Sequence, residues 1–334
     1  MNFERIVDLP AGVGEHYFWR SEGEVCFFRH LPHEDDPLQP GNFELIYVNT
    51  ETGEAADLRE FNVRNSSGLV GSIARASHQG VPGDDVINYP PQHAVSPDGR
   101  WLTWLRRYPP ETAEWITAAL DGSTAEHRRY PMTPRITGGH PLWFSDSRRW
   151  AALVQKYENQ VHSIEEAGVF TLNDLETEQH VTITEGSDGL LVGMDYGGDA
   201  LFRLPEWKVR VAERALMLRI PLRPGTVTPT RFEIQLPSAA FIWDIVSSPD
   251  GTQLAWVLGG ANPRSDPHEI WLSGIAGEDM RPLASVPLFI ENSDQRVTGK
   301  RCHFPRKLAW RPGGEVVSFI YRNALWSVRT SATD

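Results

Sequence analysis

The chain has 334 residues, of which 40% are hydrophobic and 23% charged, and its formal net charge is −12. These values are typical of a folded globular protein and exclude a disordered chain, and the excess of acidic residues argues against nucleic acid as a partner. No segment stays apolar over the roughly 18 residues that a membrane span needs, so no membrane partner is expected either.

The N-terminal residues and the cysteines bear on where the protein works. Glu4, Arg5 and Asp8 interrupt the apolar residues at the start of the chain, which therefore lacks the hydrophobic stretch of a secretory signal. The two cysteines, Cys26 and Cys302, are too few and too far apart for a disulfide framework or a zinc ribbon. Both observations predict a protein of the reducing cytoplasm.

Short turn sequences recur along the chain between runs of apolar residues. The clearest is Ser-Pro-Asp-Gly, in which Pro presets the dihedral angle of the second turn position, Asp can bond nearby backbone, and Gly takes the following position with positive φ. Full or degraded copies lie near these residues, in chain order: Ser21, Ser96, Ser145, Tyr196, Ser248 and Arg311. Most are about 50 residues apart, a period that predicts a repeat architecture.

Each repeat contains short alternating runs rich in Trp, Val, Ile, Phe and Thr, which favour strands over helices. Four antiparallel strands at this period predict an all-β fold, a six-bladed β-propeller with four-stranded blades in a single domain spanning 1–334. The predicted blades are 14–61, 91–131, 138–184, 188–236, 240–287 and 303–330. Residues 62–90 are predicted as an insertion, with a seventh, degenerate blade in this region as the alternative.

The two ends of the chain are predicted to share the last blade. The sixth repeat stops after its third strand near Thr330, one strand short of a blade. At the other end, "NFERIVDLPAG" is similar to the fourth strand of the fourth repeat, "TRFEIQLPSAA", in its Phe-Glu pair and its Leu-Pro exit. Residues 2–10 are therefore predicted to complete the last blade and to close the ring, which leaves no exposed sheet edge there.

The pattern Ser-Pro-Asp-Gly-x-x-Leu-x-Trp occurs at Ser96–Trp104 and at Ser248–Trp256. It resembles the WD40-like repeat of TolB-like propellers, which are related to the propeller domain of prolyl oligopeptidases. The resemblance implies a fold and brings no catalytic residue with it, because these repeats are structural. The chain also departs from prolyl oligopeptidases in lacking the Gly-x-Ser-x-Gly elbow of a hydrolase domain.

Long connections are expected on one face of the propeller, since the turns on the other face are tight. They are 30–42, 62–91, 132–141, 155–168, 203–213, 258–268 and 287–306. Long loops in a compact domain usually serve function, so this face is the candidate binding surface.

The starts of the innermost strands are predicted to meet at the mouth of the central channel on this face. Candidate ligand-binding residues there are Glu15, His16, His93, His140, Trp243, Asp244, Arg306 and Lys307. Imidazole is a common metal ligand, so His16, His93 and His140 are candidate ligands of a divalent metal, although the sequence requires no cofactor. Asp244 and Arg306 are the candidate catalytic residues. The alternative is that these polar side chains line a water-filled channel and cap the strand ends.

Two functions are compatible with this pattern. The first is a binding or scaffold module that presents its loop-rich face to a protein, a peptide or a small molecule. The second is a metal-assisted lyase or hydrolase with its site at the channel mouth. Nucleotide and zinc-protease chemistry are unsupported, because the chain has no Gly-x-x-x-x-Gly-Lys-Ser/Thr and no His-Glu-x-x-His sequence.

Overall fold

The computed structural model is built from β-strands. It describes residues 3–11, 13–32, 40–57, 84–86, 96, 98–108, 112–119, 125–131, 136–144, 147–156, 168–174, 179–186, 190–194, 200–204, 211–221, 230–260, 266–287, 289–291, 301–303 and 305–331. These residues include no helix, and the strand pairs whose register is defined are antiparallel. Accordingly, the described part of the chain has no helix long and apolar enough to cross a membrane.

The chain divides into two compact units. The central unit comprises residues 10–191 and 221–228, and the terminal unit comprises residues 1–9, 192–220 and 229–334. Each unit contains sheets whose strands follow one another in chain order, as a meander does, and the terminal unit brings the two ends of the chain together.

The central unit holds three four-stranded sheets. Their strands are β2 (Val13–Ser21), β3 (Glu24–Pro32), β4 (Pro40–Asn49) and β5 (Ala55–Asp57); β6 (Asp84–Val86), β7 (Trp101–Tyr108), β8 (Thr112–Ala119) and β9 (Ala125–Pro131); and β10 (Ile136–Trp143), β11 (Arg149–Lys156), β12 (Gly168–Asp174) and β13 (Gln179–Gly186). The segment 62–90, predicted as an insertion, thus contributes β6, which pairs with β7. The predicted first strand of this blade, around His93, lies outside the described residues.

The terminal unit holds most of a seven-stranded sheet, a four-stranded sheet and a hairpin. The large sheet runs through β14 (Leu190–Met194), β15 (Ala200–Leu204), β16 (Val211–Pro221), β17 (Thr230–Ser247), β18 (Gln253–Gly259), β19 (His268–Gly274) and β20 (Arg281–Val286). The four-stranded sheet has the order β1 (Phe3–Asp8), β25 (Ala324–Arg329), β24 (Val316–Tyr321) and β23 (Arg306–Trp310). The hairpin pairs β21 (Phe289–Glu291) with β22 (Arg301–His303).

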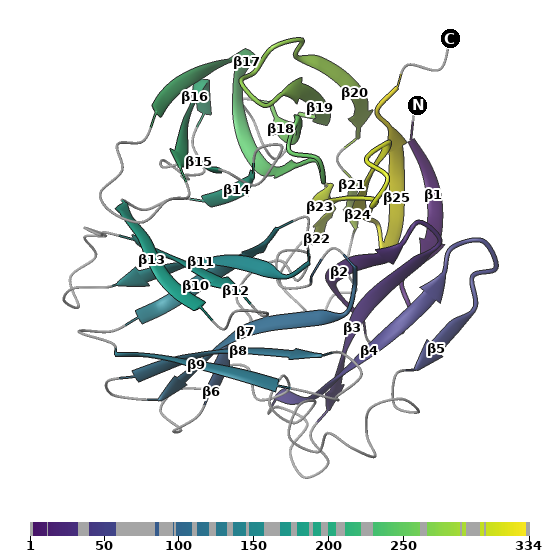
Figure 1. Cartoon of the computed structure of the whole chain (residues 1–334). Coiled ribbons are helices and arrows are strands. Elements are labelled where there is room, and N and C mark those ends of the chain that lie inside the picture. The colour runs from purple at the N-terminus through teal and green to yellow at the C-terminus, as the bar shows by residue number, and fades with distance from the viewer. Residues whose placement is uncertain are drawn as a thin grey trace. The chain divides into compact units, whose positions relative to one another are not determined.

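The predicted pairing of the N-terminal strand with the end of the chain is confirmed. β1 runs antiparallel to β25, with Phe3 opposite Val328 and Asp8 opposite Ala324 (Figure 1). The Phe3 ring packs at 5.3 Å from Trp326 and at 5.9 Å from Phe319, in both cases edge to face. Apolar packing therefore joins the first strand to the last two.

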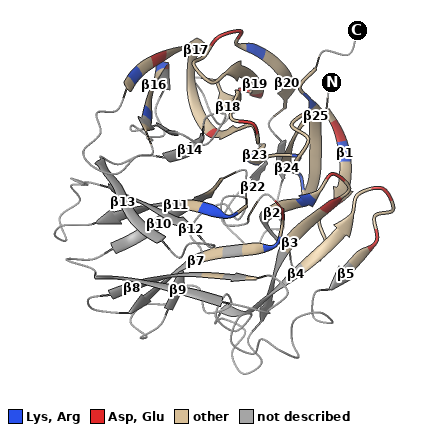
Figure 2. Cartoon of the chain, viewed as in Figure 1, with Lys and Arg blue, Asp and Glu red and all other residues tan. Residues whose placement is uncertain are grey.

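Charge contributes little to this attachment. Figure 2 shows acidic and basic residues on the same short strand β1, where Arg5 and Asp8 form an ion pair. Both side chains are more than half exposed. Such exposed pairs are worth about 0–1 kcal/mol, so the pair does not hold β1 in place.

The strand β17 differs from the sequence prediction. Its 18 residues continue through the point where the fourth blade was predicted to end and the fifth to begin. The register with β16 shifts at this point, because Ala212 pairs with Ala240 but Arg214 pairs with Gln235. The exposed segment 237–239 therefore forms a bulge that pairs with no residue of β16. The expected loop is thus a bend within one strand.

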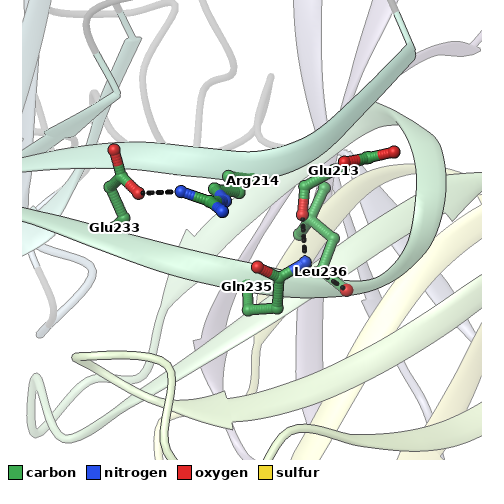
Figure 3. Close-up of polar contacts among 5 residues, drawn as sticks. All are labelled: Glu213, Arg214, Glu233, Gln235 and Leu236. Atoms are coloured by element: carbon green, nitrogen blue, oxygen red, sulfur yellow. Dashed lines mark hydrogen bonds and ion pairs between the residues drawn. The ribbon is translucent and has the colours of Figure 1, made fainter.

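Polar side chains brace this bend on the β16 side (Figure 3). The amide Nε2 of Gln235 donates a hydrogen bond to the carbonyl of Glu213, the residue that the register shift skips, at 2.9 Å. The guanidinium of Arg214 contacts the carboxylate of Glu233 at 2.9 Å across the two strands. The first contact supplies a donor to a carbonyl that the bulge removes from the ladder.

The turn motif folds as its residue types predict. Ser248 Oγ donates to the Asp250 carboxylate at 2.5 Å and accepts hydrogen bonds from the N–H groups of Thr252 and Gln253, while Gly251 has a φ of 70°. The turn at Ser96 repeats this arrangement. The Ser-Pro-Asp-Gly sequence thus satisfies backbone groups that a tight turn would otherwise leave unpaired.

Two degraded copies keep the same backbone turn. In the third repeat, Phe144 N–H donates to the Arg149 carbonyl and Ser147 has a φ of 54°; in the sixth, Arg311 N–H donates to Val316 and Gly314 has a φ of 76°. The third turn therefore starts at Phe144, one residue before the predicted Ser145.

Candidate functional site

The structure describes four candidate site residues in full, all in the terminal unit. Trp243 and Asp244 lie on β17, and Arg306 and Lys307 on β23. Glu15 and His16 lie on β2 and His140 on β10, but their side chains are outside the described part, as is the whole of His93. The described part of the candidate site therefore lies on β17 and β23.

Trp243 occupies a bulge in β17. Ile242 pairs with Leu258 and Asp244 with Val257, so Trp243 is the extra residue at this shift in the register with β18. An extra residue of this kind bends the strand and changes the direction of the side chains that follow it, and bulges are frequent beside active sites.

A second bulge lies in β23. Arg306 pairs with Ile320 and Ala309 with Ser318, so Lys307 and Leu308 together face one residue of β24. Lys307 has a φ of 56°. The other non-glycine residues with positive φ in the described chain lie in turns or bends, whereas Lys307 lies inside a strand. A left-handed residue costs of order 1 kcal/mol and marks a position that its surroundings enforce.

The carboxylate of Asp244 joins the two bulges. Its Oδ2 accepts a hydrogen bond from the N–H of Leu308 at 2.8 Å, and its Oδ1 accepts one from the N–H of Ile245 at 2.9 Å. Burial raises the pKa of Asp244 to about 6, against the N–H of Leu308 and the charge of Lys307, which lower it. Asp244 is thus a bridge between two sheets, and its carboxyl group ionises near pH 6.

His268 is a site residue that the sequence did not indicate. It opens β19, pairs with Gly259 of β18, and is fully buried, with its ring 5.6 Å from that of Trp243. Burial and then the positive charge of Arg306 lower the pKa of His268 to about 4, so the imidazole is neutral at physiological pH. Its one signal was its place at the end of the long connection 258–268, where a strand begins.

Gly259 makes room for the Trp243 ring. A Cβ at this position would lie 2.4 Å from Trp243 Nε1 and 3.3 Å from His268 Cδ2. The first distance is far inside van der Waals contact, so any larger side chain forces the indole to move. The absence of a side chain at Gly259 therefore sets the position of Trp243.

This gives a direct prediction for Gly259→Ala. We expect the variant to displace the Trp243 indole, to shift the tryptophan emission spectrum and to lower the free energy of unfolding by about 1–3 kcal/mol, the usual cost of overpacking. Gly23→Ala is the matched control, because a Cβ there meets nothing within 4 Å and the φ is not positive. A Gly259→Ala spectrum and stability equal to those of Gly23→Ala would contradict the packing described above.

Register irregularities recur at the starts of other sheets. In the central unit, β2 shifts against β3 between Val13 and Tyr17, and β10 shifts against β11 between Ile136 and Gly138. Glu15 and His16 lie within the first of these shifts, whereas His140 pairs regularly with Leu153. Bulged first strands thus coincide with several of the positions that the sequence singled out.

The predicted metal site consists of three histidine side chains. The side chains of His16, His93 and His140 lie outside the described residues. Among the side chains that are described, no group of three His, Cys, Asp or Glu residues is arranged to hold a metal ion.

Comparison with known proteins bears on the fold. No known protein family matches the sequence, and no curated protein is similar to it. Among solved structures, an oligogalacturonate lyase in complex with manganese is 11% identical, with a TM-score of 0.50 over 98% of this chain and 96% of that one. The putative TolB of Agrobacterium tumefaciens is 12% identical, with a TM-score of 0.49 over 95% and 90%.

The β-propeller domain of the Trilobed protease from Pyrococcus furiosus is 14% identical, with a TM-score of 0.46 over 94% of this chain and 92% of that domain. The chain has a TolB-like propeller fold. A prolyl endopeptidase structure is also similar, at 11% identity and a TM-score of 0.46 over 93% of this chain and 38% of that one. At these identities the likeness is one of fold, and the activities of these proteins are not transferred.

Proposed function

We propose that this protein is a cytoplasmic, six-bladed propeller of one domain that binds an anionic small molecule or peptide where its inner strands begin. Support comes from the meander sheets of both units, from the pairing of β1 with β25, and from the bulges at Trp243 and Lys307. A rigid ring with a loop-rich face suits such a role.

The observation that carries the proposal is the set of hydrogen bonds that the Asp244 carboxylate accepts. Both of its oxygens accept backbone hydrogen bonds, one of them from the neighbouring sheet. A general base must reach a proton of the substrate, and a carboxylate held by two backbone N–H groups is better suited to shaping the site. The hydrogen bonds of Asp244 therefore favour a role in ligand binding over a catalytic role for this residue.

The ligand class follows from the residues beside Asp244. Trp243 offers an aromatic ring, and Arg306 and Lys307 offer cationic groups that suit carboxylates. A sugar acid combines a ring face with a carboxylate. Because one structure of similar fold is described as an oligogalacturonate lyase, an oligogalacturonate is a practical probe.

Calorimetric titration with this probe tests the proposal, in the presence and absence of manganese. We expect saturable binding that weakens at least tenfold in Lys307→Glu, with the oligosaccharide recovered intact. Asp279→Asn is the control, because Asp279 is exposed in a turn and asparagine tolerates its φ of 53°. Absence of binding would overturn the ligand class, and manganese-dependent cleavage would establish the lyase instead.

A further inference from the structure

Among the hydrogen bonds that join β17 to β23, two differ in chemistry. The N–H of Leu308 donates to the Asp244 carboxylate at 2.8 Å, whereas the indole N–H of Trp310 donates to the carbonyl of Val246 at 3.3 Å. A backbone carbonyl does not titrate between pH 4 and pH 8, but a carboxyl group can. The first contact can therefore respond to pH, and the second is an internal reference.

The bridge lies where both strands leave their regular ladder. Asp244 directly follows the bulge at Trp243, and Leu308 lies in the bulge of β23. The Asp244 carboxylate accepts hydrogen bonds from Leu308 on one strand and Ile245 on the other. One side chain thus satisfies backbone donors of two sheets. A change in its charge acts on both sheets at once.

Charged groups surround this bridge on β23 and near β19. On β23, Lys307 is the cation that acts on Asp244, and Arg306 precedes it in the strand. His268 opens β19 and is neutral above about pH 4, and Asp266 lies just before that strand. The strand β18, which pairs with this part of β17, carries no charged residue. Lys307 is therefore the main compensating charge for the ionised carboxylate.

We propose that Asp244 is a proton-operated latch between β17 and β23, which closes more firmly when its carboxyl group is neutral and loosens when the group ionises. The neutral acid still accepts the N–H of Leu308 through its carbonyl oxygen. The ionised form gives up hydration on closing, and the backbone N–H groups and Lys307 offset part of that loss. This role does not require that the proposed ligand is correct.

The direction of the effect follows from linkage. Closed, the group has a pKa of about 6; in an opened state, where water reaches the carboxyl group, the pKa returns toward its ordinary value of 3.8. The closed state thus binds the proton more tightly, so opening becomes more favourable as pH rises through the interval between these values. The ratio of open to closed molecules should rise by up to about 100-fold from pH 4 to pH 7.

Amide hydrogen exchange on the intact protein tests the latch. The protection factor of the Leu308 amide is measured from pH 4 to pH 7.5, corrected for the intrinsic exchange rate. We expect it to fall by roughly 10- to 100-fold between about pH 4 and pH 6 and to level off above pH 6, while the Arg311 amide beside Trp310, which donates to the carbonyl of Val316, keeps constant protection. A flat profile at Leu308, or an equal fall beside Trp310, would overturn the proposal.

Two variants identify the groups that control the latch. Asp244→Asn mimics the neutral acid and should make protection at Leu308 independent of pH. Lys307→Met removes the compensating charge and should move the pH at which the fall levels off to a value above 6. Persistence of the wild-type profile in Asp244→Asn would show that another group titrates. An unchanged upper limit of the fall in Lys307→Met would remove Lys307 from the latch.

Discussion

Deletion of residues 2–9 is expected to open the last sheet and to lower stability by more than the loss of any single side chain of β1. The deletion exposes the edge of β25, because β1 is its sole partner on that side. It also strips the Phe3 ring from Phe319, Tyr321 and Trp326. The loss of stability therefore comes from lost strand pairing and from lost aromatic packing.

Phe3→Ala separates the packing from the pairing. The variant keeps the backbone ladder of β1 and should lower the free energy of unfolding by about 2–4 kcal/mol, as is usual for truncating a packed aromatic ring. Asp8→Ala is the control, because its ion pair with Arg5 is exposed and should matter by less than about 1 kcal/mol. Denaturant unfolding measures both. Equal stability of the two variants would mean that β1 is not held by Phe3.

The second large effect concerns pH. Asp244 has a pKa raised to about 6 in the folded protein, so its folded form holds a proton that the unfolded chain has already lost between about pH 4 and pH 6. Its contribution therefore falls as pH rises through this interval. His268 has a pKa lowered to about 4, so between about pH 4 and pH 6.5 the unfolded chain binds the proton. The contribution of His268 to stability therefore rises with pH. The contributions of Asp244 and His268 each amount to about 3 kcal/mol.

These opposite slopes should nearly cancel in the wild-type protein. Asp244→Asn is expected to leave the His268 effect, so that stability relative to wild type increases by about 3 kcal/mol from pH 4 to pH 6.5. His268→Gln is expected to leave the Asp244 effect, with the opposite slope. Denaturant titrations of the three proteins at several pH values give these differences directly. Parallel pH profiles for all three would contradict both pKa shifts.

The sequence predicted the strands and the turns because both depend on local chemistry. Alternating apolar residues set the strands, and Ser96 and Ser248 bond the backbone within five residues. The pairing of β1 with β25 was also predictable, since the strand around Phe3 has an internal counterpart in the fourth repeat.

The site was harder to predict because its contacts cross between strands. The contact between His268 and Trp243 depends on how β17, β18 and β19 are aligned with one another. No local pattern in the connection 258–268 specifies this alignment. Lys307 gave no hint of a positive φ, which glycine or asparagine would have signalled. The Leu-Pro sequence at Pro237 indicated a strand end, yet the exposed bulge there tolerates proline and the strand continues.

The assignment of the site depends on β23 being the first strand of a sheet whose fourth strand is β1. A cysteine pair placed at Glu4 and Ser327, which face each other across β1 and β25, tests this order most directly, with Cys302→Ser to prevent other pairings. Mild oxidation of the purified monomer should give an intramolecular disulfide, mapped by mass spectrometry and absent from the single Glu4→Cys variant. Failure to form this bond, or its formation only between molecules, would contradict the order of strands on which the site rests.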